Sequence, residues 1–303
     1  MPNEERVRVR VADRQLVVSN LGKVLYPATG FTKAQVIEYY VKIAPVLLPH
    51  IAGRLLTLKR YPDGVDGEFF YQKNVPQGTP DWVRTARVPA PGSTMNRDQV
   101  TYVVADDLPT LIWAANLANL EIHTPQWRLP GDVRAVERTP DPDLVVFDLD
   151  PGPPATIVEC CRVAELLRPA LTARGLDPLA KTSGNKGMQL LARISGHSSA
   201  QASELAKEVA EELAAAHPDL VTAKMTKRLR TGKVFIDWSQ NNAFKTTVAP
   251  YSLRARSEPT VSTPVTWDEV AACRAEHQLR FTSDEVLDRA AEHGDLLEPL
   301  LAG

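Results

Sequence analysis

The sequence has 303 residues, enough for one large domain or two ordinary ones, and its 44% apolar content is that of a folded protein. Three cysteines, two of them adjacent, form neither a disulfide framework nor a zinc motif, which favours a reducing compartment. No apolar run is long enough to cross a bilayer, so we expect a cytoplasmic protein. The net charge of −2 hides a basic block, 221–256, in which Asp237 is the single acid.

The first 120 residues predict a mixture of strands and helices. Valines alternate with arginines over 6–11, the period of a half-exposed strand. Helical spacing follows, with Thr32 as the N-cap, and Pro45 is expected to kink or end this helix. The next predicted elements are three short strands and one helix, at 55–60, 69–72, 102–105 and 108–120.

A second unit begins with an apolar strand at 144–149. After it, helices and strands alternate, at 157–173, 179–181, 188–194, 200–217 and 233–238. The tail from Trp267 predicts two short helices. We therefore predict an α/β fold, with residues 1–303 as a single catalytic domain and lobes of roughly 1–135 and 136–303.

The stretch DLVVFDLDPG, 143–152, ends a buried strand with two carboxylates. Side chains at i and i+2 of a strand point to the same face, so Asp148 and Asp150 project together and repel each other. A divalent cation such as Mg²⁺ or Mn²⁺ would relieve that repulsion. A calcium-binding EF-hand loop is excluded, because Pro153 stands where such a loop needs glycine. These residues alone leave a metal site and a simple capped turn equally supported.

The turn KTSGNKGMQ, 181–189, lies between two predicted strands. Its glycines would let backbone N–H groups approach a phosphate, to which Ser183 and Lys186 would add a hydroxyl and a positive charge, although ordinary hairpin turns have a similar composition. Asp237, in KVFIDWS, is either an ion-pair centre or a third metal ligand. An acid pair, a phosphate-binding turn and a third acid among bases together predict a two-metal nucleotidyl transfer.

Six motifs carry a family resemblance, in the order KVLYPATGFTK, IHTPQW, FDLDPG, SGNKG, KVFIDWSQN and APYSLR. As a set they resemble the primase-polymerases of bacterial non-homologous end joining, the archaeo-eukaryotic primase type found as the polymerase domain of ligase D. The resemblance extends from about Val17 to Leu300. It implies an RRM-like sheet lobe packed against a smaller α/β lobe, with the active site in the cleft. No ligase or nuclease region precedes Gly303, as expected of a stand-alone member or an excised domain.

The resemblance also implies a role for individual residues, transferred position by position. The catalytic residues and metal ligands would be Asp148, Asp150 and Asp237. The residues around the incoming nucleotide would be Lys59, His123, Ser183, Lys186, Gln189 and Arg254. The DNA contacts would be Asn20, Lys23 and Lys33 at a downstream 5′-phosphate, Phe69 and Phe70 against the template, and Arg230 at the primer end. By frequency alone, a phenylalanine pair is more often core and a lone histidine more often structural.

One position departs from the family pattern. The second motif of the family, S-G-x-K-G-x-H, ends in histidine, and this chain has Gln189 there. Glutamine can donate a hydrogen bond to a phosphate but cannot carry a positive charge. The affinity for the triphosphate, or its dependence on pH, is therefore expected to differ.

The implied function is template-dependent nucleotidyl transfer, in which primers are extended and short gaps filled at DNA breaks. Two Mg²⁺ or Mn²⁺ ions would be the cofactors, and NTPs or dNTPs the substrates. The partners would be gapped or broken DNA with a 5′-phosphate, with Ku and a DNA ligase, and the protein would associate with the nucleoid. No membrane is involved.

Two other classes of protein compete with this interpretation. A covalent ligase needs Lys-x-Asp-Gly, and KRYPDG places three residues between Lys59 and Asp63, which excludes it. A non-catalytic DNA-end binding module stays the alternative, although three acids in a phosphate-contacting region would weaken such a module. Dependence on a metal ion separates a polymerase from a binder.

Overall fold

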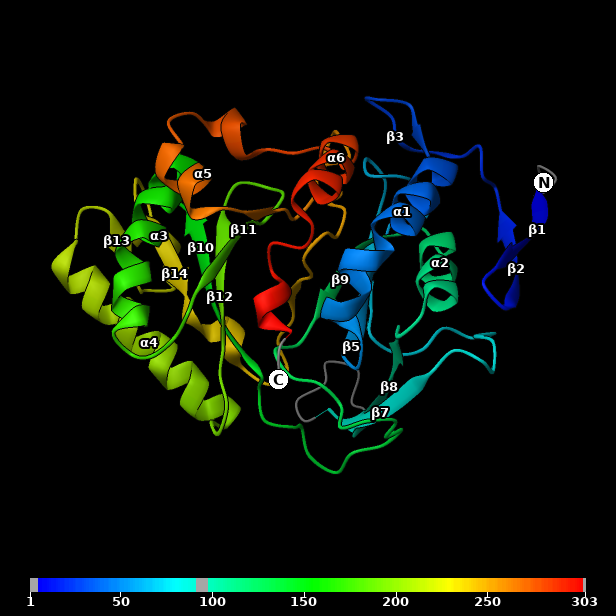
Figure 1. The fold of residues 1–303 in the computed structure, drawn as a ribbon, viewed down its shortest axis with the longest axis horizontal. Coiled ribbons are helices and arrows are strands. Elements are labelled where there is room, and N and C mark those ends of the chain that lie inside the picture. The colour runs from blue at the N-terminus through cyan, green and yellow to red at the C-terminus, as the bar shows by residue number, and fades with distance from the viewer. Residues whose placement is uncertain (1–4, 91–97, 302–303) are drawn as a thin grey trace.

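The computed structural model describes residues 5–90 and 98–301, which form two six-stranded sheets and two small hairpin sheets (Figure 1). The elements of the first 124 residues are β1 (Arg6–Val11), β2 (Arg14–Ser19), β3 (Val24–Tyr26), β4 (Phe31–Thr32), α1 (Lys33–Ile51), β5 (Leu55–Arg60), β6 (Phe70–Gln72), β7 (Thr85–Pro89), β8 (Gln99–Val104), α2 (Leu108–Asn116) and β9 (Asn119–Thr124). None of the helices in the described ranges is long and apolar enough to span a membrane.

Helix α1 begins where the sequence predicts and ends later. Thr32 caps it, and the Thr32 backbone N–H donates to the Gln35 side chain over 2.8 Å. Of the two outcomes predicted at Pro45, a kink or an end, the end is wrong, because α1 continues to Ile51. Its buried face explains this: Tyr40 is fully buried and donates through its hydroxyl to the Leu120 carbonyl over 2.7 Å, so packing outweighs the missing backbone hydrogen bond.

The predicted helix at 108–120 is too long. Helix α2 ends at Asn116, and Ala118 adopts a positive φ of 56°, which a continuing helix does not allow. The chain then forms β9, which pairs with β5 in the first sheet. The order of this sheet is β15-β9-β5-β8-β7, with β6 also paired to β5. Strand β9 becomes important for the site, because it carries His123.

The second sheet follows the predicted succession of elements. Its elements are β10 (Leu144–Pro151), α3 (Ile157–Thr172), β11 (Leu179–Thr182), β12 (Met188–Arg193), α4 (Ser199–Ala216), β13 (Val221–Thr222) and β14 (Val234–Asp237). Apart from the short β13, this is a β-α-β-β-α-β unit, with strand order β13-β14-β10-β12-β11-β16. Helices α3 and α4 lie against β10 (Figure 1). Phe147 and Leu149 belong to the buried core that these helices share with the sheet. The alternate residues Asp148 and Asp150 therefore face the other side.

The chain after β14 contributes to both sheets. Its strands and helices are β15 (Thr247–Val248), β16 (Pro264–Val265), α5 (Trp267–Ala272) and α6 (Ser283–His293), with 3-10 turns at Trp238–Asn241, Glu276–Leu279 and Glu298–Leu300. Another 3-10 turn, Lys227–Leu229, precedes β14. Strand β15 pairs with β9 of the first sheet, and β16 pairs with β11 of the second. Helix α5 packs on α3 and α6 packs on α1, so this part of the chain joins the two sheets (Figure 1).

A buried ion-pair cluster also connects the two halves. Arg54, between α1 and β5, donates through both terminal nitrogens to Asp143, just before β10, over 2.8 and 2.6 Å. Arg128 donates to the same carboxylate over 3.0 Å and to the Ala52 carbonyl over 3.0 Å. The Arg54 side chain is only 2% exposed. The carboxylate of Asp143 is thus the counter-ion of a guanidinium that has almost no access to water.

Candidate active site

Three of the predicted site residues lie side by side across the second sheet. Asp148 on β10 is paired directly with Asp237 on β14 and with Gln189 on β12. Gln189 is paired in turn with Lys181 on β11. Directly paired residues point to the same face, so the three strands present two carboxylates and an amide in one row. Asp150 lies on the same face, two residues beyond Asp148.

Each carboxylate has donors of its own. The Gln189 amide donates to Asp148 over 3.0 Å, and the Ser239 hydroxyl and the Gln240 amide donate to Asp237 over 2.6 and 2.7 Å. Asp150 forms ion pairs with Lys186 at 2.9 Å and Arg230 at 3.5 Å. Arg230 and Lys186 thus reach the acid pair from the basic segment and from the glycine-rich turn.

Asp148 has a raised pKa. Burial raises its pKa to about 6, the negative charges of Asp237 and Asp150 add to that rise, and the hydrogen bond from Gln189 opposes it. Within residues 5–90 and 98–301, no three His, Cys, Asp or Glu side chains converge closely enough to hold a metal ion. The oxygen donors of the three aspartates nonetheless suit Mg²⁺ or Mn²⁺, and a cation would relieve the repulsion that raises the pKa of Asp148.

The glycine-rich turn packs tightly against β10 and against the chain at Val261. Ser183 donates its backbone N–H to the Gly187 carbonyl over 2.8 Å, and its hydroxyl accepts from the Gly187 N–H over 3.2 Å. A Cβ on Gly187 would lie 2.1 Å from the Leu149 carbonyl oxygen, and one on Gly184, whose φ is +66°, would lie 2.6 Å from Val261. Both positions therefore require glycine.

A cavity of about 210 Å³ opens between the two sheets beside this turn. It is lined by His123, Asp148, Leu149, Asp150, Ser183, Asn185, Lys186, Gly187, Gln189, Gln240, Thr246, Thr247, Val248 and Arg254. The structure thus brings together Asp148, Asp150 and every predicted nucleotide residue except Lys59. Asp237 does not line the cavity, but it accepts a hydrogen bond from Gln240, which does.

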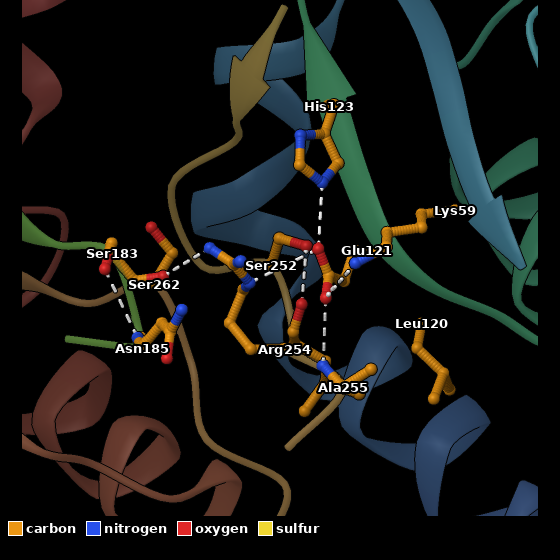
Figure 2. A network of polar contacts seen from close by, with 12 residues as sticks. Lys59, Leu120, Glu121, His123, Ser183, Asn185, Ser252, Arg254, Ala255 and Ser262 are labelled. Atoms are coloured by element: carbon orange, nitrogen blue, oxygen red, sulfur yellow. Dashed lines mark hydrogen bonds and ion pairs between the residues drawn. The ribbon is translucent and has the colours of Figure 1, made fainter. Parts of the chain in front are cut away.

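Lys59 belongs to a polar network beside the cavity, centred on Glu121 (Figure 2). The Glu121 side chain is 1% exposed and pairs with Lys59 at 3.3 Å, His123 at 2.9 Å and Arg254 at 3.3 Å. It also accepts the Ala255 backbone N–H over 3.1 Å. Arg254 extends the network by donating to the Ser183 carbonyl over 2.6 Å. Glu121 therefore holds three cationic or polar side chains at one wall of the site.

The charges in this network depend on one another. Burial by itself would raise the pKa of Glu121, but the hydrogen bond from His123 and the charges of Arg254 and Lys59 together hold it well below its usual range. Burial lowers the pKa of His123, an effect that the contact with Glu121 opposes and the two cations reinforce. Glu121 is thus a permanent anion that balances the basic wall.

Glu121 is a site residue that the sequence does not predict. It stands two residues before His123, so the two side chains share one face of β9. The predicted helix at 108–120 hides this alternation, because it places Glu121 just after the end of a helix. A strand assignment for EIH would have revealed a buried acid next to a predicted nucleotide residue.

The predicted 5′-phosphate residues lie together at the start of α1. The Lys33 backbone N–H donates to the Lys23 carbonyl over 2.8 Å, which places the two residues side by side. Their ammonium groups have different acceptors: Lys23 pairs with Asp63 at 2.8 Å, and Lys33 donates to the Ser19 carbonyl over 2.6 Å. Asn20 follows Ser19 directly and has a positive φ of 53°.

The predicted aromatic pair lies outside the core. Phe69 is 51% exposed and Phe70 is 44% exposed. The Lys59 ammonium lies 4.4 Å from the centroid of the Phe69 ring, so the pair borders the Glu121 network. Phe70 lines a second cavity, of about 660 Å³, which shares Thr246 with the first. The exposed rings are therefore next to the candidate nucleotide site.

Comparisons with known proteins agree with this geometry. The sequence profile described as "LigD, primase-polymerase domain" matches residues 32–297. The chain belongs to the LigD primase-polymerase family. The multifunctional non-homologous end joining protein LigD of Mycolicibacterium smegmatis is 47% identical over 99% of this chain, and the bifunctional LigD of Bacillus subtilis is 30% identical over 92%. The polymerase domain of Mycobacterium tuberculosis ligase D, solved in complex with DNA, matches with a TM-score of 0.87 and 44% identity, over 94% of this chain and 98% of that one.

Family membership confirms the resemblance, the primase-polymerase fold and the enzyme class predicted from the sequence. A LigD primase-polymerase is a nucleotidyltransferase, and this chain is such an enzyme. The chain spans 37% of the length of the Mycolicibacterium relative and 43% of the Bacillus relative. What those longer proteins do as a whole is therefore a separate question from the chemistry of this domain.

One prediction concerns the exposed aromatic pair of this LigD-type domain. Phe70→Ala should weaken binding to gapped DNA by about 1–3 kcal/mol, the usual contribution of an aromatic ring that stacks on a base. The melting temperature should not change, because the ring is 44% exposed. Fluorescence anisotropy with a gapped template and a thermal melt measure the two effects. Phe70→Trp should restore binding, and a lower melting temperature with unchanged affinity would assign Phe70 to packing instead.

A second prediction concerns the residue that replaces the family histidine. Gln189 is 4% exposed, lines the cavity and cannot titrate. In Gln189→His, an imidazole with an ordinary pKa near ~6.5 would add a positive charge beside the triphosphate as the pH falls. The KM for the nucleotide should therefore decrease between about pH 7.5 and 6 in the variant, relative to the wild type. Identical pH profiles of KM would show that position 189 does not sense the triphosphate.

Proposed function

We propose that this protein is a template-dependent primase-polymerase that extends primers and fills short gaps at DNA breaks during end joining. The observation that carries this proposal is the cavity between the sheets, where Asp148 and Asp150 meet a glycine-rich turn and the basic side chains of Lys186 and Arg254. Asp237 is the cross-strand partner of Asp148. Nucleotidyl transfer requires carboxylates that bind divalent cations and, beside them, basic side chains that bind phosphates. Residues 1–303 would act as one catalytic domain.

The proposed roles follow from position. Ser183, Lys186 and Arg254 would bind the triphosphate of the incoming NTP or dNTP, with His123 and Lys59 at the same wall. Asp148, Asp150 and Asp237 would hold two divalent ions, Mg²⁺ or Mn²⁺. When bound, such ions lower the pKa of an attacking hydroxyl and neutralise charge on the leaving pyrophosphate. The exposed Lys186 is paired with Asp150. When the nucleotide binds, Lys186 would leave Asp150 and contact the triphosphate.

The proposed DNA contacts surround this pocket. Phe69 and Phe70 would stack on the template, and Arg230, which lies 3.5 Å from Asp150, would guide the primer end. Asn20, Lys23 and Lys33 would bind the downstream 5′-phosphate. The relatives are named as end-joining proteins, so we extend the proposal to Ku and a DNA ligase as partners, and to action on nucleoid DNA in the cytoplasm.

Primer extension on a one-nucleotide gap tests the proposal. The purified protein should add one templated nucleotide with Mg²⁺ or Mn²⁺ and none after chelation, and parallel reactions with NTPs and dNTPs should establish the preferred sugar. Binding of the same DNA without metal-dependent extension would instead support the non-catalytic end-binding module. Reactions with a nucleotide that does not pair with the template base serve as the control for untemplated addition.

A further prediction concerns the 5′-phosphate. Removal of the downstream 5′-phosphate should weaken binding to gapped DNA, because a terminal phosphate carries more charge than an internal diester and would lie at the N-terminus of α1 between two lysines. Lys23→Ala combined with Lys33→Ala should erase that difference. Anisotropy titrations with phosphorylated and unphosphorylated strands measure it. Equal affinities in the wild type would mean that the two lysines contribute only diffuse attraction.

A further inference from the structure

The first hairpin of the chain, β1–β2, has two faces of opposite character. In the β1–β2 register Arg6 pairs with Ser19, Arg8 with Val17 and Arg10 with Gln15. These six residues share the outer face, and all three arginines are exposed. Neither strand contains an aspartate or a glutamate. The outer face is therefore a row of positive charges without an acid in either strand.

The inner face fixes the hairpin in place. Leu16 and Val18 are 5% and 2% exposed, and Val9 and Val11 pack against the core of the first lobe. Asn116, the last residue of α2, accepts the Ser19 backbone N–H over 3.0 Å and donates to the Val17 carbonyl over 3.2 Å. A hairpin anchored in this way presents its arginines at fixed spacing, unlike a flexible basic tail.

The row of arginines runs up to the candidate 5′-phosphate site. The Asn20 N–H donates to the Glu5 carbonyl over 2.8 Å, and Lys33 donates to the Ser19 carbonyl over 2.6 Å. Ser19 is the cross-strand partner of Arg6. Arg8 and Arg10 follow on the same face, each about 6.8 Å further away, since a strand rises about 3.4 Å per residue.

We propose that this outer face binds the sugar-phosphate backbone of the duplex downstream of the gap. The inference rests on the proposed function, because it takes the end of the row beside Asn20 and Lys33 as the position of the terminal phosphate. From Arg6 to Arg10 the row spans about 14 Å, which corresponds to the rise of about four base pairs at 3.4 Å each. Exposed guanidinium groups are suited to phosphate oxygens, which they contact as planar forks of N–H donors.

We expect these contacts to be independent of DNA sequence, because the arginine row would contact phosphates and not base edges. The hairpin would instead fix the direction in which the downstream duplex leaves the protein. A terminal phosphate alone leaves that direction undetermined. With the arginine row, a duplex that continues beyond the phosphate binds more tightly than the phosphate end by itself.

The test uses Arg8→Gln combined with Arg10→Gln, in the full chain, with gapped DNA carrying a downstream 5′-phosphate. Both side chains are exposed, so the melting temperature should stay the same. The slope of log affinity against log salt should become shallower by about 2, roughly one unit for each lost phosphate contact. The matched control is Arg162→Gln combined with Arg193→Gln, which removes the same charge from exposed sites on α3 and β12. The control should leave the slope unchanged.

Neutral DNA linkages locate the contact. Methylphosphonates at the first four phosphates inside the downstream duplex, placed in one strand or the other, should weaken wild-type binding for the contacted strand. They should have no further effect on the arginine variant. Equal losses in the arginine variant and in the control, or equal sensitivity of wild type and variant to the neutral linkages, would overturn the proposal in favour of diffuse attraction.

The 5′-phosphate pocket is tested separately in the same titrations. The arginine variant should still prefer phosphorylated over unphosphorylated gapped DNA, because Lys23 and Lys33 are intact. A wild type that ignores the 5′-phosphate but loses affinity with neutral linkages would remove the pocket from the proposed function and keep the arginine row. A wild type whose binding depends on the 5′-phosphate but not on the neutral linkages would keep the pocket in the proposed function and remove the arginine row.

Discussion

Asp148→Asn and Asp237→Ala should each abolish primer extension while leaving the protein folded and able to bind gapped DNA. The two residues are directly paired on adjacent strands, and Asp148 and Asp150 line the cavity. Loss of one ligand would remove several kcal/mol of transition-state stabilisation, which corresponds to a decrease of about 100-fold or more in rate. Single-turnover extension on a one-nucleotide gap measures this decrease.

The stability of the same variant separates a chemical role from a structural one. Burial raises the pKa of Asp148 to about 6, above the ordinary value of 3.8 that we assume for the unfolded chain. The folded state thus binds the proton more tightly, and wild-type stability should fall as the pH rises between about 4 and 6 in the absence of divalent ions. Asp148→Asn has no such titration. At pH 7.5 we expect this variant to be as stable as the wild type or more stable, by up to about 3 kcal/mol.

Divalent ions should make the wild type more stable than Asp148→Asn. A cation that binds only the folded wild type stabilises it by mass action, so Mn²⁺ should raise the melting temperature of the wild type and not of Asp148→Asn. Asp177→Asn, at an exposed acid before β11, is the matched control and should behave as the wild type in every assay. Wild-type rates of extension by Asp237→Ala would remove that residue from the catalytic group.

The sequence predicted the structure best where the spacing of apolar residues and the position of the charged ones indicated the same element. The apolar run of β10 is buried through Phe147 and Leu149, and its alternation places Asp148 and Asp150 on the opposite face, as predicted. The cross-strand neighbours of Asp148 could not be predicted in this way. Register depends on how β12 and β14 pair with β10, and the paired residues are 39 to 89 positions apart in the chain.

The errors have a common physical cause, which is that tertiary packing outweighed local preference. Pro45 did not end α1, because the buried face around Tyr40 holds the helix together. The predicted helix at 108–120 extends past Ala118. In the structure, the chain has a positive φ at Ala118 and turns there into β9. This second error concealed Glu121, whose role is visible only when Lys59 from β5 and Arg254 from a loop meet it beside His123 of its own strand (Figure 2).

Asp143→Ala should destabilise the protein by about 3–5 kcal/mol, because it leaves the charge of Arg54 buried without a counter-ion. The Arg54 side chain is 2% exposed, and both of its terminal nitrogens donate to Asp143. Burial lowers the pKa of Arg54, which shows that the charged form has lost its hydration, and Asp143 partly offsets this effect. Urea denaturation of the variant and the wild type measures the difference in the free energy of unfolding.

A surface arginine–carboxylate pair is the control. Arg174 donates through one terminal nitrogen to both oxygens of Glu212, over 2.7 and 2.6 Å, and Glu212 is 58% exposed. Glu212→Ala should therefore cost at most about 1 kcal/mol, since water replaces the lost carboxylate. Both variants remove a carboxylate that accepts two short hydrogen bonds from an arginine, and the two sites differ in burial.

A double-mutant cycle then isolates the pair itself. In an Arg54→Met background the buried charge is absent, and Asp143 keeps Arg128 at 3.0 Å and contact with water. Asp143→Ala should then cost much less than in the wild type, so the two substitutions should be strongly non-additive. Additive effects would mean that Arg54 stabilises the junction of α1 and β5 through its bonds to the His50 and Pro125 carbonyls alone. Non-additivity would establish the Arg54 and Asp143 pair as the electrostatic connection that holds β10, and with it Asp148, against the first sheet.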